Sequence, residues 1–89
     1  MARLQYAGSR YGGATVVGNK LVAPANLTRR GARFQNTSDT DMWVTETSVP
    51  AAVGTGYKVA AGTYLYVHTN MAVNVYCTVI SKTYECTDY

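Results

Sequence analysis

Few residues of this chain could perform chemistry, and none of them stands in a recognised catalytic spacing. His68 is the only histidine, and no serine, cysteine or acidic partner accompanies it in sequence, so we interpret it as a structural strand residue. Together with Cys77 and Cys86 it does not reproduce the spacing of a zinc site. We therefore expect no enzymatic activity, no catalytic residue and no cofactor.

A polar run at residues 36–41, NTSDTD, contains Asp39 and Asp41. Two carboxylates in one turn could contribute to a calcium site, but a hard cation usually recruits six or more oxygen ligands. Aspartate, asparagine and serine also bond to their own backbone and so favour turns. We interpret the pair as turn residues and expect no metal.

Positive charge is concentrated in the first third of the chain. Residues 1–33 contain six basic residues and no acidic one, whereas residues 34–89 contain all five acidic residues and two lysines. Guanidinium groups pair bidentately with carboxylates and are enriched at protein interfaces, as are tyrosines. A solvated surface is the alternative for isolated basic residues. We predict that Arg29, Arg30 and Arg33 contact an acidic patch on a neighbouring copy or on another protein. Further interface candidates, in the N-terminal region, are Arg3, Tyr6, Arg10 and Tyr11.

Two other binding functions are compatible with these residue types. Arginines interleaved with Tyr6, Tyr11 and Phe34 could grip phosphates and stack bases on a β surface. The net charge of only +3, and the aromatic residues that continue through the acidic part, make nucleic acid the less favoured partner. Trp43 and the tyrosines could bind a sugar, although a single tryptophan between Met42 and Val44 is more typical of a core residue.

The elements that must position these residues are strands. At 89 residues the chain has room for one domain, and its abundant Thr, Tyr and Val suit pleated, half-buried surfaces. We predict an all-β fold, a small antiparallel β-sandwich or barrel of about six to eight short strands. An extended basic N-terminal arm should occupy residues 1–13 and a single β domain residues 14–89. The later strands are expected at residues 33–36, 42–47, 57–60, 64–68, 73–80 and 84–86.

Three turn sequences predict hairpins. Gly18 and Asn19 fit a two-residue loop, residues 36–41 would connect the strands on either side, and Ser81 with Lys82 would close the last hairpin. That last register places Cys77 opposite Cys86, close enough for a strained disulfide. The N-terminal sequence lacks the apolar stretch of a signal peptide and no segment is apolar enough to span a membrane. We therefore expect folding in the cytoplasm, free thiols and no membrane partner.

The run from Asn26 to Val44 resembles a pattern of small virion proteins of tailed bacteriophages. The pattern consists of an Asn, an Arg-Arg-Gly entry, a short apolar strand, Gln-Asn-x-Ser-Asp and a second apolar strand. The resemblance continues with the Lys-Val-Ala-Ala-Gly of residues 58–62 and with the terminal Ser-Lys-Thr-Tyr of residues 81–84, so it covers roughly residues 24–89. The two cysteines and the tyrosine- and glycine-rich basic N-terminus depart from it.

The resemblance implies a β-rich, non-enzymatic structural protein of the phage particle. It is consistent with a capsid decoration or cement protein, or with a collar or tail component. The implied partners are the major capsid protein or another virion protein, together with self-association as a homo-oligomer, and the implied location is the virion. A carbohydrate- or nucleic-acid-binding β module remains the alternative from another functional class.

Overall fold

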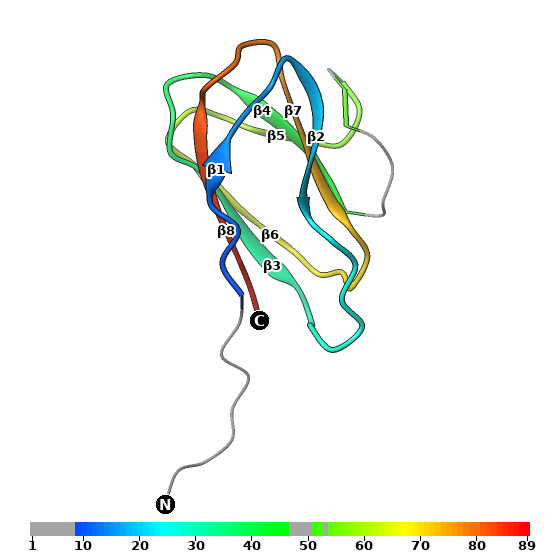
Figure 1. Ribbon diagram of the computed structural model, residues 1–89. Coiled ribbons are helices and arrows are strands. Elements are labelled where there is room, and N and C mark those ends of the chain that lie inside the picture. Colours follow the sequence, from blue (N-terminus) through cyan, green and yellow to red (C-terminus); the bar gives the residue numbers. More distant parts are fainter. Residues whose placement is uncertain (1–8, 47–50, 53) are drawn as a thin grey trace, which may run out of the picture.

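The fold consists of two antiparallel β-sheets packed face to face, with no helix among the described residues (Figure 1). The computed structural model describes residues 9–46, 51–52 and 54–89. The predicted all-β class is confirmed, and the arrangement is that of a small β-sandwich. The strands in these ranges are β1 (Gly13–Ala14), β2 (Gly18–Ala23), β3 (Ala32–Asn36), β4 (Met42–Thr45), β5 (Tyr57–Val59), β6 (Tyr64–Val67), β7 (Val73–Cys77) and β8 (Thr83–Asp88).

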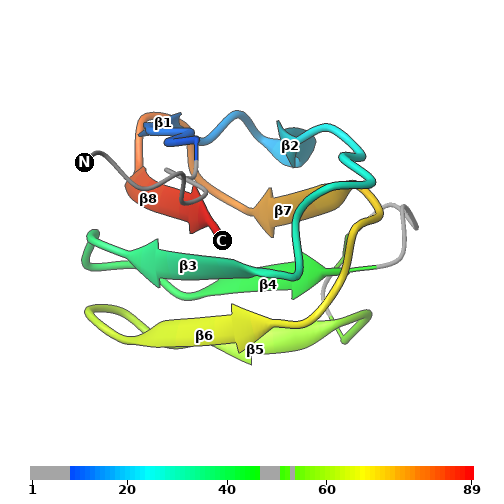
Figure 2. The same ribbon diagram turned by 90° about the horizontal axis from the view of Figure 1, so that it is seen from below.

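The chain passes repeatedly from one sheet to the other. The first sheet has the strand order β1-β8-β3-β6 and the second sheet the order β2-β7-β4-β5. In Figure 2 the edge strands β1 and β2 lie at one side of the sandwich, and the edge strands β6 and β5 lie at the opposite side. Of the strands that are consecutive in sequence, only β4 and β5 are direct hydrogen-bonded neighbours. The other described connections cross between the sheets.

The predicted hairpin around Gly18 and Asn19 is wrong. Gly18 is the first residue of β2, and its φ of 101° is one that glycine adopts readily. The partner of β2 is β7, where Gly18 lies opposite Cys77 and Asn19 opposite Tyr76. The glycine-asparagine pair has the local preference of a hairpin loop, but this pairing buries the far end of β2 in the core and overrides that preference.

Residues 36–41 form a turn, as their chemistry predicts, but the turn does not close a hairpin. It leads from β3 in the first sheet to β4 in the second. The fully buried Asn36 shapes it, because its side-chain amide donates to the carbonyl oxygens of Thr40 at 2.7 Å and Val59 at 2.9 Å. Its side-chain oxygen accepts the backbone N–H of Ser38 at 3.0 Å. These bonds satisfy a buried amide while the chain crosses between the layers.

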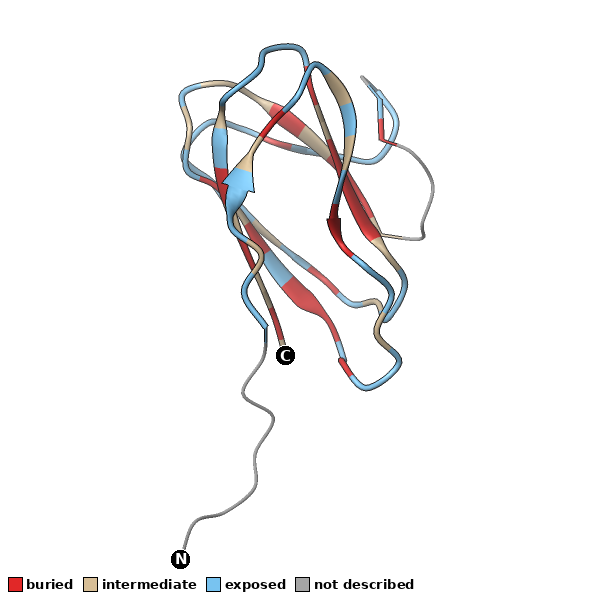
Figure 3. Cartoon of the chain, viewed as in Figure 1, coloured by how far each residue is buried: buried red, intermediate tan, exposed pale blue. Residues whose placement is uncertain are grey.

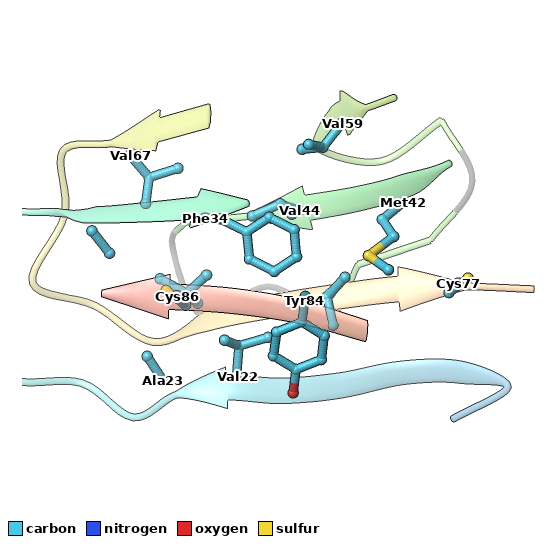
Figure 4. Packing of buried hydrophobic residues seen from close by; sticks show 13 residues of the cluster. Val22, Ala23, Phe34, Met42, Val44, Val59, Val67, Cys77, Tyr84 and Cys86 are labelled. Atoms are coloured by element: carbon cyan, nitrogen blue, oxygen red, sulfur yellow. The ribbon is translucent and has the colours of Figure 1, made fainter. Parts of the chain in front are cut away.

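The predicted terminal hairpin is also wrong, so its two cysteines do not face each other. β7 belongs to the second sheet and β8 to the first. Cys77 therefore lies opposite Gly18, and Cys86 lies opposite Phe34. Both cysteines are buried free thiols, and Figure 4 shows them well apart in the core.

The core is formed by every second residue of the strands, since successive side chains of a strand point to opposite faces. Ala32, Phe34 and Asn36 of β3 are buried while Arg33 between them is exposed. The rings of Phe34 and Tyr84 stack with centroids 5.5 Å apart. Figure 4 shows Val44, Met42 and other side chains of the second sheet facing these rings, and Figure 3 shows buried and more exposed positions alternating along β3 and β8.

Part of the predicted N-terminal arm belongs to the sandwich. Residues 1–8 lie outside the described residues, but residues 9–13 run beside β8 (Figure 1). Arg10 forms a β-bridge with Thr87, and the backbone N–H of Tyr11 donates to the carbonyl oxygen of Cys86 at 2.7 Å. β1 then continues this pairing, with Gly13 opposite Tyr84. Residues 9–13, which the prediction assigned to the arm, therefore belong to the described part of the β domain.

Candidate binding face of the first sheet

Aromatic and basic side chains gather on the outer face of the first sheet. Tyr64 and Tyr66 of β6 are exposed, at 60% and 52% of their surface, whereas Val67 beside them is buried. The strand register places Arg33 of β3 directly beside Tyr66. His68 follows Tyr66 on the same side, and Tyr89 lies against both rings. We call the set of Arg33, Tyr64, Tyr66, His68 and Tyr89 the tyrosine–arginine face.

The four rings of the tyrosine–arginine face form a continuous row. The centroids of Tyr64 and Tyr66 are 5.8 Å apart with an interplanar angle of 89°. Tyr66 and Tyr89 are 6.2 Å apart, and Tyr89 and His68 are 6.4 Å apart, again edge to face. The hydroxyl group of Tyr89 is also within hydrogen-bond distance, 3.1 Å, of His68 Nδ1. Such edge-to-face contacts are favourable for aromatic rings, so the row presents a preformed, amphipathic surface.

Gly31 is the residue that lets Tyr89 lie across this corner of the sheet. A Cβ atom at position 31 would be 2.5 Å from the carbonyl oxygen of Val67 and 2.7 Å from the Tyr89 hydroxyl oxygen. Only a residue without a side chain fits so close to a neighbouring backbone. In the sequence this glycine follows two arginines, and no local signal indicates its role.

Two arginines at this face have no ion-pair partner among the described residues. Arg33 is exposed, and its cross-strand neighbours, Tyr66 and Thr87, are uncharged. Arg30 is exposed at the same corner, where its backbone N–H donates to the carbonyl oxygen of Tyr89 at 2.6 Å. Both guanidinium groups are therefore available to an anionic group from outside.

Arg29 differs from its neighbour and is not a surface residue. Its side chain is fully buried, and Nη1 lies 3.8 Å from Oδ2 of the equally buried Asp88. Nε donates to the carbonyl oxygen of Thr69 at 3.1 Å, Nη1 to that of Pro24 at 2.9 Å, and Nη2 to that of Met71. The prediction that Arg29 contacts a neighbouring protein is thus corrected, because its donors are used inside the fold.

The remaining predicted interface residues fall into different environments. Arg3 and Tyr6 lie outside the described residues. Arg10 is exposed and forms an ion pair with Glu85 at 3.0 Å. Tyr11 is half-buried against the core, and its hydroxyl group donates to Asp88 Oδ2 at 3.4 Å. Only Arg10, Arg30 and Arg33 of the described candidates therefore present a side chain to the surface.

Two aromatic residues weighed for other ligands also occupy unexpected positions. Phe34 is completely buried, so it cannot stack on a base. Trp43 is not a core residue, because its neighbours Met42 and Val44 take the inward positions of β4. It lies half-buried on the outer face of the second sheet, edge to face with Tyr76 at 6.3 Å.

The two aspartates of the polar turn each pair with a lysine. Asp39 accepts a hydrogen bond from Lys82 Nζ at 2.8 Å, and this bond holds the pKa of Asp39 below its usual value. Asp41 lies 3.3 Å from Lys58 Nζ, and the hydrogen bond from the Ala61 backbone N–H is the main cause of its lowered pKa. Among the residues that the structure describes, no three His, Cys, Asp or Glu side chains gather as metal ligands would.

Comparison of the chain with protein-family models, with curated proteins and with solved structures found no match. Nor does the described part of the chain contain a helix long and apolar enough to cross a membrane.

Proposed function

We propose that this chain is a non-enzymatic structural protein of a tailed-bacteriophage particle, acting as a capsid decoration or cement protein through protein–protein contacts. The observation that carries the proposal is the tyrosine–arginine face, in which Tyr64 and Tyr66 expose more than half of their surface beside the unpaired Arg33. Tyrosine and arginine are the residue types that dominate binding energy at protein interfaces.

The construction of this face supports a role as a docking surface. Each tyrosine offers a large ring at low entropic cost together with a polar tip. The rings are already oriented by their contacts with one another and with His68, so little freedom is lost on binding. A sheet face also holds its side chains more precisely than a loop does, which suits a protein that must bind a repeated lattice.

The resemblance to virion proteins involves residues that build this corner of the fold and the turn at the other end of β3. In its Arg-Arg-Gly entry, Arg29 anchors the loop internally, Arg30 remains at the surface, and Gly31 makes room for Tyr89. In its second part, Asn36 organises the crossing between the sheets. A collar or tail component would use the same kind of contact, and the location on the particle distinguishes it from a capsid protein.

Rebinding to particles tests this proposal. Particles of the phage that encodes this chain, assembled without it, should bind the purified protein and sediment with it. Tyr66→Ser should weaken this binding about tenfold or more, as expected for an aromatic hot spot. Tyr57→Ser is a matched control, because Tyr57 is 50% exposed but belongs to the second sheet. Absence of binding by the wild-type protein, or an equal loss for both variants, would contradict the proposal.

A further inference from the structure

We infer that the tyrosine–arginine face binds an acidic segment of a different protein and not a second copy of this chain. The inference rests on the proposed function only in taking this face as a protein interface. The basis is the distribution of charge in the fold. Every side-chain carboxylate has a partner within the fold, whereas the guanidinium group of Arg33 on this face has no ion-pair partner among the described residues.

All five side-chain carboxylates of the chain have partners within the fold. Four of them form ion pairs with basic side chains, and the fifth accepts a hydrogen bond from a tyrosine hydroxyl group. The pairs are Asp39 with Lys82, Asp41 with Lys58, Glu46 with Tyr57, Glu85 with Arg10, and Asp88 with Arg29. Glu46 is the one side-chain carboxylate without a basic partner, and it follows β4 of the second sheet. A like-to-like contact of two copies through the tyrosine–arginine face therefore brings no uncommitted side-chain carboxylate to Arg33.

Not all of the basic side chains have an ion-pair partner among the described residues. Four of the eight Lys and Arg side chains are used in the ion pairs. The side chain of Lys20 reaches from β2 to β1 of the other sheet, where Nζ donates to the carbonyl oxygen of Ala14 at 2.7 Å and lies 5.3 Å from the Tyr84 ring centroid. Among the described residues this leaves Arg30 and Arg33, which both lie at or beside the tyrosine–arginine face.

Self-association through this face gains little from its charges. Glu85 is the one carboxylate on the outer face of the first sheet, opposite Gln35, and it already holds Arg10 at 3.0 Å. A dimer that paired Glu85 with Arg33 of another copy would exchange one ion pair for another. An acidic segment from a different chain instead adds a new pair and removes the repulsion between two positively charged faces.

The surroundings of Arg33 favour a polypeptide over a nucleic acid. Strong binding to a phosphate backbone usually requires several cationic contacts along a track. Among the described residues, this face and its surroundings offer only Arg33 and Arg30 without an ion-pair partner, beside the Arg10–Glu85 pair. The rings of Tyr64 and Tyr66 also lean edge to face against each other and do not form a series of parallel platforms for bases. A carboxylate can instead meet Arg33 bidentately while an adjoining apolar or aromatic side chain packs on Tyr66.

Selection from a random peptide library displayed on a carrier tests this inference with the purified full chain. Peptides retained by the wild-type protein and lost on Arg33→Glu should be enriched in Asp and Glu next to apolar or aromatic residues. Their affinity should fall about tenfold or more on Arg33→Gln and should weaken as salt screens the pair. Lys58→Gln, which changes an exposed lysine of the second sheet, should leave their affinity unchanged.

Three results would overturn the inference. The first is a retained set of peptides without acidic enrichment, or one that binds Arg33→Glu equally well. The second is tighter binding of oligothymidylate at Arg33, which would assign the face to single-stranded nucleic acid. The third is concentration-dependent dimerisation in sedimentation that Arg33→Glu abolishes. If the protein binds particles but shows no preference for acidic peptides, the inference fails and the proposed function stands. If it prefers acidic peptides but does not bind particles, the proposed function fails and the inference stands.

Discussion

Arg29 and Asp88 meet in the interior of the sandwich, with Nη1 3.8 Å from Oδ2 and both side chains fully buried. Asp88 also accepts hydrogen bonds from the backbone N–H of Ser9 and the hydroxyl group of Tyr11. The pair thus joins the first described residues, the loop before β3 and the last strand. Because each buried charge depends on the other for compensation, the loss of either one should be costly.

Arg29→Met should destabilise the fold by about 3–5 kcal/mol, since it leaves the Asp88 carboxylate buried without its counter-charge. This is a large fraction of the stability of a small domain. Urea denaturation followed by Trp43 fluorescence measures the change. Arg33→Met is the matched control, because it removes an exposed arginine from the neighbouring strand and should cost less than about 0.5 kcal/mol.

Removing both partners should cost less than the two single losses together. In Arg29→Met with Asp88→Leu no unpaired charge remains in the core, and replacement of a buried pair by apolar residues is often well tolerated. Additive losses in this double-mutant cycle, or equal losses for Arg29→Met and Arg33→Met, would show that the buried pair does not anchor the fold.

Acid should destabilise the protein partly through Asp39 and Asp41. Hydrogen bonds from Lys82 and from the Ala61 backbone lower the pKa of these carboxyl groups in the folded state from the ordinary value of 3.8. A lowered folded pKa means that the stabilisation is present above the unfolded value and is lost as the pH falls through the folded value. Thermal unfolding measured between about pH 6 and pH 2 should therefore show a decline below about pH 4.

The variant carrying both Asp39→Asn and Asp41→Asn is the control for the acid prediction. It lacks the two titrating groups but keeps the polar turn, so its stability should depend less steeply on pH below about 4. Identical slopes for the variant and the wild-type protein would mean that these two lysine pairs contribute nothing to the acid response.

Cys86 should be inert towards alkylation in the folded protein. Burial raises the pKa of the Cys86 thiol to about 11, and the thiolate is the reactive species. Iodoacetamide at neutral pH should therefore leave Cys86 unlabelled until the protein is unfolded in urea, after which both cysteines should be labelled without prior reduction. Mass spectrometry measures the number of labelled cysteines directly. A mass lower by two hydrogens and no labelling after unfolding would instead demonstrate a disulfide.

Gly31→Ala should displace the Tyr89 ring from His68. The new methyl group would lie 2.5 Å from the Val67 carbonyl oxygen and 2.7 Å from the Tyr89 hydroxyl oxygen, and such overpacking typically costs about 1–3 kcal/mol. The NMR signals of the His68 ring should shift as Tyr89 moves away.

Gly62→Ala separates steric displacement from a general loss of stability. Position 62 has open space for a methyl group, although its φ of 77° makes alanine strained there, at a cost of about 1–2 kcal/mol. The His68 signals should stay unchanged in this variant. Unchanged His68 signals in Gly31→Ala would show that Gly31 does not control the position of Tyr89.

The strands of this fold could be predicted from local patterns, but most of their partners could not. Alternation in Tyr-Leu-Tyr-Val predicts that Tyr64 and Tyr66 share one face of a strand, and β6 has that form. The turn chemistry at residues 36–41 was also recognised correctly. However, a short polar turn can close a hairpin or carry the chain to the opposite sheet, and only the packing of distant core residues decides between these outcomes.

The binding face was predictable only in part for the same reason. Arg29 and Arg30 are indistinguishable by local pattern, and the burial of Arg29 depends on Asp88 near the other end of the chain. Tyr89 joins Tyr66 and His68 because β8 and β6 flank β3 in one sheet. Such long-range pairings leave no short-range signal in the sequence, so Arg33 could be predicted as an interface residue but the aromatic row around it could not.

A density map of the proposed phage particle is the most direct test of the proposed contact. We expect the sandwich to be bound to the particle with the tyrosine–arginine face buried against a different virion protein, and an acidic side chain of that protein to lie within ion-pair distance of Arg33. The outer face of the second sheet, including Lys58 and Trp43, should lie away from this contact. A particle in which Tyr64, Tyr66 and Arg33 face solvent, or touch only further copies of this chain, would contradict the account.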